Sequence, residues 1–89
     1  MPAIEVTIQH GEGLHARPAS LFVKTAAQFR SEIFVTHNNR TANAKSILNV
    51  LTLGAGQGAR VTISAEGEDA SQALQTLEQM ILDNFGEPK

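Results

Sequence analysis

The sequence predicts an α+β domain of two layers, in which helices cover one face of a β-sheet. Polar and apolar residues alternate with a period of two in short segments, which is typical of half-buried strands. In other segments, apolar residues recur every three or four positions, which indicates amphipathic helices. The resulting order is β-α-β-β-α-β-α, and the three apolar helix faces need a common sheet face to cover.

Length and composition limit the classes of protein to consider. The 89 residues suffice for one domain over residues 1–89, and its core is expected to be aliphatic because Trp and Tyr are absent. The absence of Cys excludes disulfides and thiolate metal sites and is compatible with a reducing cytoplasm. We expect no cofactor and no metal. The net charge of −2, with scattered basic residues, does not indicate a nucleic-acid-binding surface. We expect neither a signal peptide nor a membrane span.

The first third of the chain predicts a strand, a loop and a helix. Residues 4–9 alternate, and residues 10–13 form a loop in which His10 is expected to be solvated. From Ala16 to about Phe29 the period becomes helical. The inner face of this helix is formed by Ala19, Phe22, Val23, Ala26 and Phe29.

A hairpin and a short helix follow. Residues 32–36 alternate, residues 37–40 form a turn that includes His37, and residues 40–43 complete the hairpin. Ser46 is a favoured N-cap for the next helix. This helix has too many apolar residues for one buried side, so we expect Val50 and Leu53 to be buried and the others exposed, as at a partner surface. The exposed set is predicted to be Ile47, Leu48 and Leu51.

The last part of the chain predicts a strand and the longest helix. Glycines 54, 56 and 58 indicate a flexible connection, and residues 60–65 alternate. Asp69 is the predicted N-cap of a helix, Phe85 is expected to extend its inner face by one turn, and residues 87–89 are expected to fray. The inner face is predicted to contain Ala70, Ala73, Leu74, Leu77 and Ile81.

One stretch of the chain combines the elements of an anion site. Pro18 suits the first turn of a helix, so His15 lies at or just before a helix N-terminus, where the free N–H group of Ala16 and the helix dipole attract anions. Arg17 adds a guanidinium that can bind phosphate oxygens. Each residue alone has an ordinary structural explanation, as a cap, a surface cation or a helix start. Together within five residues, after the turn at Gly13, they predict a phosphoryl-accepting histidine.

These residues resemble the active centre of a known family. Residues 13–19 (GLHARPA) are similar to the active-centre motif of HPr, the histidine-containing phosphocarrier of the bacterial sugar phosphotransferase system. Residues 43–54 (NAKSILNVLTLG) resemble the family's second signature, around its regulatory serine, and residues 61–68 (VTISAEGE) resemble its last strand and turn. The resemblance covers essentially the whole chain. It implies an open-faced antiparallel sheet with the strand order 1-4-2-3.

The resemblance also implies roles for individual residues. His15 would accept a phosphoryl group on Nδ1 from Enzyme I and pass it to the A domain of an enzyme II, with Arg17 and the N–H of Ala16 stabilising its charge. The chain would be a monomeric carrier and not an enzyme. Family members often have more Lys in the docking region, whereas this chain has Ala27 and Asn49 there. The docking residues would be Ser20, Lys24, Lys45, Ile47, Leu48, Leu51, Thr52 and Gly54.

Ser46 has a second implied role besides capping. In part of the family this serine is phosphorylated by HPr kinase/phosphorylase, and the modified protein can bind a transcriptional regulator. Two other functions remain open. One is a regulatory paralogue that acts by binding partner proteins, and the other is an acylphosphatase, which has a similar length and layout and uses an Arg to hold phosphate.

Overall fold

One antiparallel sheet of four strands, in the order β1-β4-β2-β3, forms one layer of the protein. The computed structural model describes residues 2–9, 11, 13–14 and 16–86. The predicted fold class, element order and strand order are confirmed. The elements are β1 (Ala3–Thr7), α1 (Ala16–Ala26), β2 (Glu32–His37), β3 (Arg40–Asn43), α2 (Ile47–Thr52), β4 (Arg60–Glu66) and α3 (Ala70–Leu82), followed by a 3₁₀ turn over Asn84–Gly86.

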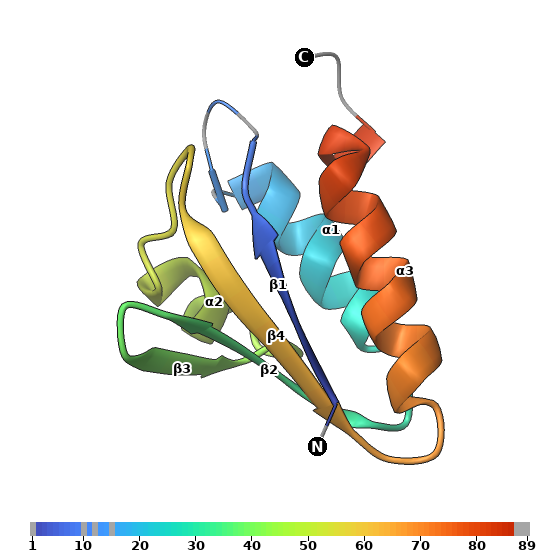
Figure 1. The fold of residues 1–89 in the computed structure, drawn as a ribbon. Helices are drawn as coiled ribbons and strands as arrows, with labels where there is room; N and C mark the ends of the chain where they lie inside the picture. The colour runs from blue at the N-terminus through green and yellow to red at the C-terminus, as the bar shows by residue number, and fades with distance from the viewer. Residues whose placement is uncertain (1, 10, 12, 15, 87–89) are drawn as a thin grey trace.

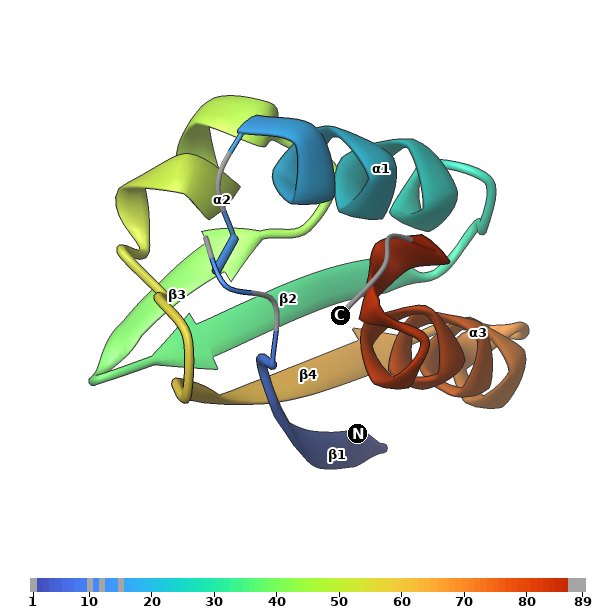
Figure 2. The same ribbon diagram turned by 90° about the horizontal axis from the view of Figure 1, so that it is seen from above.

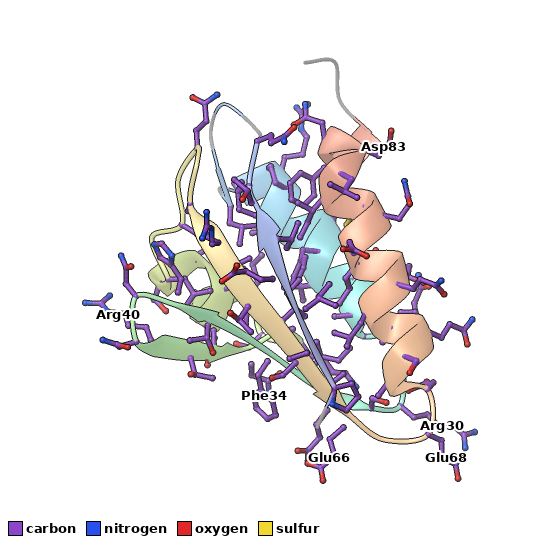
Figure 3. The ribbon with its side chains drawn as sticks, viewed as in Figure 1. Arg30, Phe34, Arg40, Glu66, Glu68 and Asp83 are labelled. Atoms are coloured by element: carbon purple, nitrogen blue, oxygen red, sulfur yellow. The ribbon has the colours of Figure 1, made fainter. Side chains whose placement is uncertain are left out.

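The helices form the second layer and leave the other face of the sheet open (Figures 1 and 2). Helix α3 packs against β1 and β4, α2 packs against β3, and α1 contacts both helices. Strand register places Val35 opposite Ile63, and both are fully buried beneath the helices. Phe34 lies opposite Ser64 and points away from the helix layer (Figure 3). The period of two in the sequence therefore separates a buried face from an open one.

The β2–β3 hairpin follows from its two turn residues. Asn38 and Asn39 both have positive φ, 49° and 67°. A two-residue turn of this kind matches the right-handed twist of paired strands, and Asn tolerates it better than most residues. The prediction that His37 lies in the turn is wrong, because it is the last residue of β2. Its Nδ1 lies 3.4 Å from the carbonyl oxygen of Arg60.

Two helices end earlier than the sequence predicts. Helix α1 ends at Ala26, because the N–H of Phe29 donates to the carbonyl of Ala26, three residues back, and tightens the chain into a turn. Helix α3 ends at Leu82, and Phe85 is buried but has a φ of 57°. Phe85 therefore joins the core through a left-handed turn and not through another helical turn.

Asp69 occupies the N-cap position of α3, but its side chain makes no capping hydrogen bond. Its carboxylate accepts hydrogen bonds from the backbone N–H groups of Arg30 and Ser31, both at 2.9 Å, and from the Ser31 hydroxyl. The contact joins the α1–β2 turn to the β4–α3 turn, which lie at the same end of the molecule, where Arg30 and Glu68 are labelled in Figure 3. The Ser31 hydroxyl and then the Arg30 N–H hold the pKa of the Asp69 carboxyl below its usual value.

We expect Asp69→Asn to lower the free energy of unfolding at neutral pH and to lose this effect in acid. A lowered folded-state pKa stabilises the protein above the unfolded pKa of about 3.9, and the contribution disappears as pH falls through the folded-state value. Urea unfolding of both proteins at neutral pH and at about pH 2 measures the difference. Asp83→Asn, an exposed carboxylate at the other end of α3, is the control. A difference that is the same at both pH values would contradict the assignment.

Candidate functional site

The anion site predicted from the sequence lies at the start of α1. His15 is outside the residues that the structure describes, so the site is built from its neighbours. Ala16 is the first residue of α1, as predicted, and both Ala16 and Arg17 are exposed. Pro18 is buried in the first turn, and no acidic side chain lies in that turn to occupy the free N–H groups. A helix N-terminus carries a partial positive charge, and no acidic residue of α1 itself offsets it in this turn.

The loop before α1 packs against the loop that follows α2. The N–H of Leu14 donates to the carbonyl of Ala55 at 2.8 Å, and the N–H of Gly58 donates to the carbonyl of Ile8 at 2.7 Å. These hydrogen bonds join the glycine-rich connection to the segments that follow β1 and precede α1. A hollow of about 590 Å³ lies between the two loops. Its lining consists of Gly11, Leu14, Ala16, Leu51, Gly54, Ala55, Gly56 and Gln57.

Helix α2 has the predicted division between buried and exposed side chains. Ser46 is its N-cap. The Ser46 Oγ accepts a hydrogen bond from the backbone N–H of Asn49, with an N···O distance of 3.4 Å. Val50 and Leu53 are buried. Leu48 is 71% exposed, and Ile47 and Leu51 are exposed by 37% and 38%.

The structure adds Leu21 to these exposed apolar residues. Leu21 lies on α1, which packs against α2, and is 37% exposed. The sequence analysis missed it, although a large apolar residue outside the predicted inner face was the available signal. The large exposed apolar residues of the packed helices α1 and α2 are called the apolar patch below: Leu21, Ile47, Leu48 and Leu51.

The remaining predicted docking residues differ in their surroundings. Lys24 is exposed on α1, and Ser20 is partly exposed one turn earlier. Thr52 and Gly54 are exposed at the end of α2. Lys45, in contrast, is partly buried, and its Nζ donates to the carbonyl oxygen of Phe29 at 2.7 Å.

Two searches of the described residues bear on other kinds of site. In the described part of the chain, no group of three or more His, Asp or Glu side chains is placed to hold a metal ion. No helix found there has the length and apolar character needed to cross a bilayer. The features that the described residues do offer are an exposed helix N-terminus, the basic side chain of Arg17 and the apolar patch.

Comparisons with known proteins agree with these features. Residues 3–83 match the family model described as the PTS HPr component phosphorylation site. The chain is 47% identical over 74 residues to phosphocarrier protein HPr of Buchnera aphidicola subsp. Acyrthosiphon pisum, with 83% of this chain and 85% of that protein covered.

Two solved structures extend the comparison. The crystal structure of HPr-C-His from Thermoanaerobacter tengcongensis matches with a TM-score of 0.97 and 45% identity, covering 100% of both chains. Crh, the Bacillus subtilis catabolite repression protein, described as a dimer with a swapped domain, matches with a TM-score of 0.75 and 37% identity, covering 94% and 97% of the two chains. Because the family model matches residues 3–83 of the chain, this chain belongs to the HPr family of phosphocarrier components of the phosphotransferase system.

Proposed function

We propose that the chain accepts a phosphoryl group on His15 from phospho-Enzyme I and passes it to enzyme II A domains during sugar uptake. The observation that carries this proposal is the start of α1 at Ala16, directly after His15, with Arg17 exposed in the first turn. A new P–N bond forms on the His15 imidazole as the bond between the phosphorus and the donor breaks. The group is later transferred onward, so the protein acts as a stoichiometric carrier.

The electrostatics of a helix N-terminus suit both states of such a carrier. The positive end of the dipole disfavours an imidazolium, which keeps the ring neutral and nucleophilic. After transfer, the free N–H groups and the Arg17 guanidinium stabilise the added negative charge. Phosphoryl transfer depends mainly on positioning and charge stabilisation, and a docked partner supplies the rest of both.

The test is phosphorylation of the intact protein by phosphoenolpyruvate and Enzyme I, followed by mass spectrometry. One acid-labile phosphoryl group per chain supports the proposal. No phosphorylation would overturn it and would favour the regulatory alternative, for which the match to Crh is the supporting observation.

We further propose that the carrier is a single domain that works in the cytoplasm. We also propose that it is a monomer, because the apolar patch must be accessible to successive partners.

The apolar patch is the proposed docking surface, with Lys24, Ser20, Thr52 and Gly54 at its rim. Exposed apolar side chains gathered on one surface usually mark a site of protein contact. The patch lies on α1 and α2, and α2 leads directly into the hollow beside the start of α1. A partner that covers the patch is therefore brought against the active centre.

Leu48→Glu is expected to weaken transfer from Enzyme I without unfolding the protein. The side chain is 71% exposed, so the free energy of unfolding should change by no more than about 0.5 kcal/mol. A charge placed in an apolar contact should raise KM at least about tenfold. The measurement is the KM of Enzyme I for the carrier. Leu82→Glu, which changes a 49% exposed leucine on α3, is the control and should leave KM unchanged. Equal effects of the two substitutions would remove the patch from docking.

We also propose that Ser46 couples a second phosphorylation to this surface, through HPr kinase/phosphorylase. A phosphate there would add about −1.5 to −2 charges next to Ile47 and Leu48. Partners with acidic rims would be repelled, and a transcriptional regulator with a basic rim would be recruited. The α2 helix would remain folded, because an acidic group is favoured at a helix N-cap.

Ser46→Asp is expected to slow phosphorylation by Enzyme I while preserving the melting temperature. Aspartate carries less charge than phosphate, so the decrease should be about threefold or more at low salt and smaller at high salt. Rates are measured at both salt concentrations. Ser71→Asp, at an exposed position in the first turn of α3, adds the same charge away from the patch and serves as the control. Equal rates for the two variants would leave Ser46 as a helix cap alone.

A further inference from the structure

The ammonium group of Lys45 connects the two helices that carry the proposed docking surface. Lys45 directly precedes Ser46, the N-cap of α2, and its Nζ donates to the carbonyl of Phe29 at 2.7 Å in a partly buried position. Phe29 lies in the turn that follows α1. A hydrogen bond from a charged ammonium to a backbone carbonyl is stronger than one between neutral groups. The contact therefore fixes the beginning of α2 to the end of α1.

A second basic side chain contacts the other end of α2. The Nη1 of Arg40 donates to the carbonyl of Thr52, the last residue of α2, at 3.3 Å. Helix α2 has no basic residue of its own in its last turn. Arg40 comes from the hairpin end of β3, where Figure 3 labels it. Two basic side chains thus bind backbone carbonyls next to α2: Lys45, just before the helix, binds Phe29 beyond α1, and Arg40 binds Thr52 at the end of α2.

Such contacts matter because α2 is only six residues long. Isolated helices of this length are not stable in water, so its position must come from its surroundings. Val50 and the C-cap Leu53 anchor it through burial, and hydrogen bonds to its flanking residues add to this anchoring. Hydrogen bonds from charged donors are stronger and more directional than apolar contacts.

We propose that Lys45 and Arg40 are positioning residues for phosphoryl transfer. They hold α2 so that Ile47, Leu48 and Leu51 face the phosphoryl donor, and they do not contact the donor themselves. The proposal rests on the proposed function and revises the direct docking role predicted for Lys45. An ammonium already bound to a carbonyl would have to break that bond to reach a partner. If α2 is already fixed in the free protein, docking does not lose binding free energy in ordering this helix.

The first experiment uses the free protein and needs no partner. In Lys45→Met, we expect faster amide hydrogen exchange in α2, including at the N–H of Val50, which donates to the carbonyl of Ser46. The rate should rise at least about threefold, and Lys45→Arg should restore most of the protection. Lys24→Met, which removes an exposed cation of α1, is the control and should leave α2 unchanged. Unchanged exchange in Lys45→Met would overturn the proposal.

The second experiment asks whether Lys45 acts through the apolar patch. We expect Lys45→Met to raise the KM of Enzyme I about threefold or more with little change in kcat, and Arg40→Met to act in the same direction. In a Leu48→Ala background the effect of Lys45→Met should shrink, because the positioned group is gone. Additive effects would show a direct contact and overturn the proposal. Arg60→Met, on the open face of the sheet, controls for net charge.

The two experiments separate this proposal from the proposed function. If Enzyme I fails to phosphorylate the wild-type protein, the carrier function is wrong, and the exchange rates still show whether Lys45 fixes α2. If the wild type is phosphorylated and the exchange rates of Lys45→Met equal those of the wild type, the positioning role alone is wrong.

Discussion

Replacing His15 by alanine is expected to abolish phosphoryl acceptance from Enzyme I. The sequence places this imidazole directly before Ala16, where α1 begins, whereas the histidine within the described residues has a different setting. His37 lies at the end of β2, with Nδ1 3.4 Å from a backbone carbonyl. Mass spectrometry after incubation with phosphoenolpyruvate and Enzyme I should show one phosphoryl group on the wild type and none on His15→Ala.

Two matched variants make the result specific. His37→Ala should accept the group at the wild-type rate. Arg17→Ala keeps the nucleophile and should slow transfer in both directions, with the free energy of unfolding within about 0.5 kcal/mol of wild type because the residue is exposed. A phosphoryl group on His15→Ala would show that the assignment is wrong.

Much of the fold could be predicted because its elements are encoded locally. Alternation of apolar residues indicates the strands, because successive side chains of a strand point to opposite faces of the sheet. The Asn38-Asn39 pair has the backbone conformation that a tight hairpin requires. The split within α2 between Val50 and Leu48 followed from a simple excess of apolar residues over what one helix side can bury. The order of the strands came from family resemblance and not from these local patterns.

The features that the sequence analysis missed depend on contacts between distant parts of the chain. Asp69 was expected to cap its own helix, but its partner Ser31 is 38 residues away. Lys45 was predicted as a docking residue and its bond to Phe29 was not foreseen, and the bond of Arg40 to Thr52 was not foreseen either. A charged side chain has several candidate acceptors within reach, and residue type and spacing do not choose among them. Only the packing of the helices on the sheet does so.

The glycine-rich connection after α2 also depends on a contact between distant parts of the chain, because the loop before α1 packs against it. Gly13, in the loop that packs against this connection, has a φ of 68° and is buried. A Cβ built there would collide with the carbonyl oxygen of Ala55 and would lie 2.5 Å from the Cα of Gly56. Both are backbone atoms, which cannot rotate away as a side chain would. The two loops approach as closely as they do because residue 13 has no side chain.

Gly13→Ala is therefore expected to lower the free energy of unfolding by about 3 kcal/mol or more, since left-handed strain and overpacking add. Separating the loops would also break the hydrogen bond from the Leu14 N–H to Ala55, two residues before Ala16. Phosphoryl acceptance should fall even at temperatures where the variant is folded. Gly54→Ala is the control, because its φ of 67° is similar but a Cβ there meets nothing within 4 Å. Strain alone should cost about 1 kcal/mol there. Urea unfolding measures both variants, and equal losses of stability would mean that the loops do not depend on their close contact at Gly13.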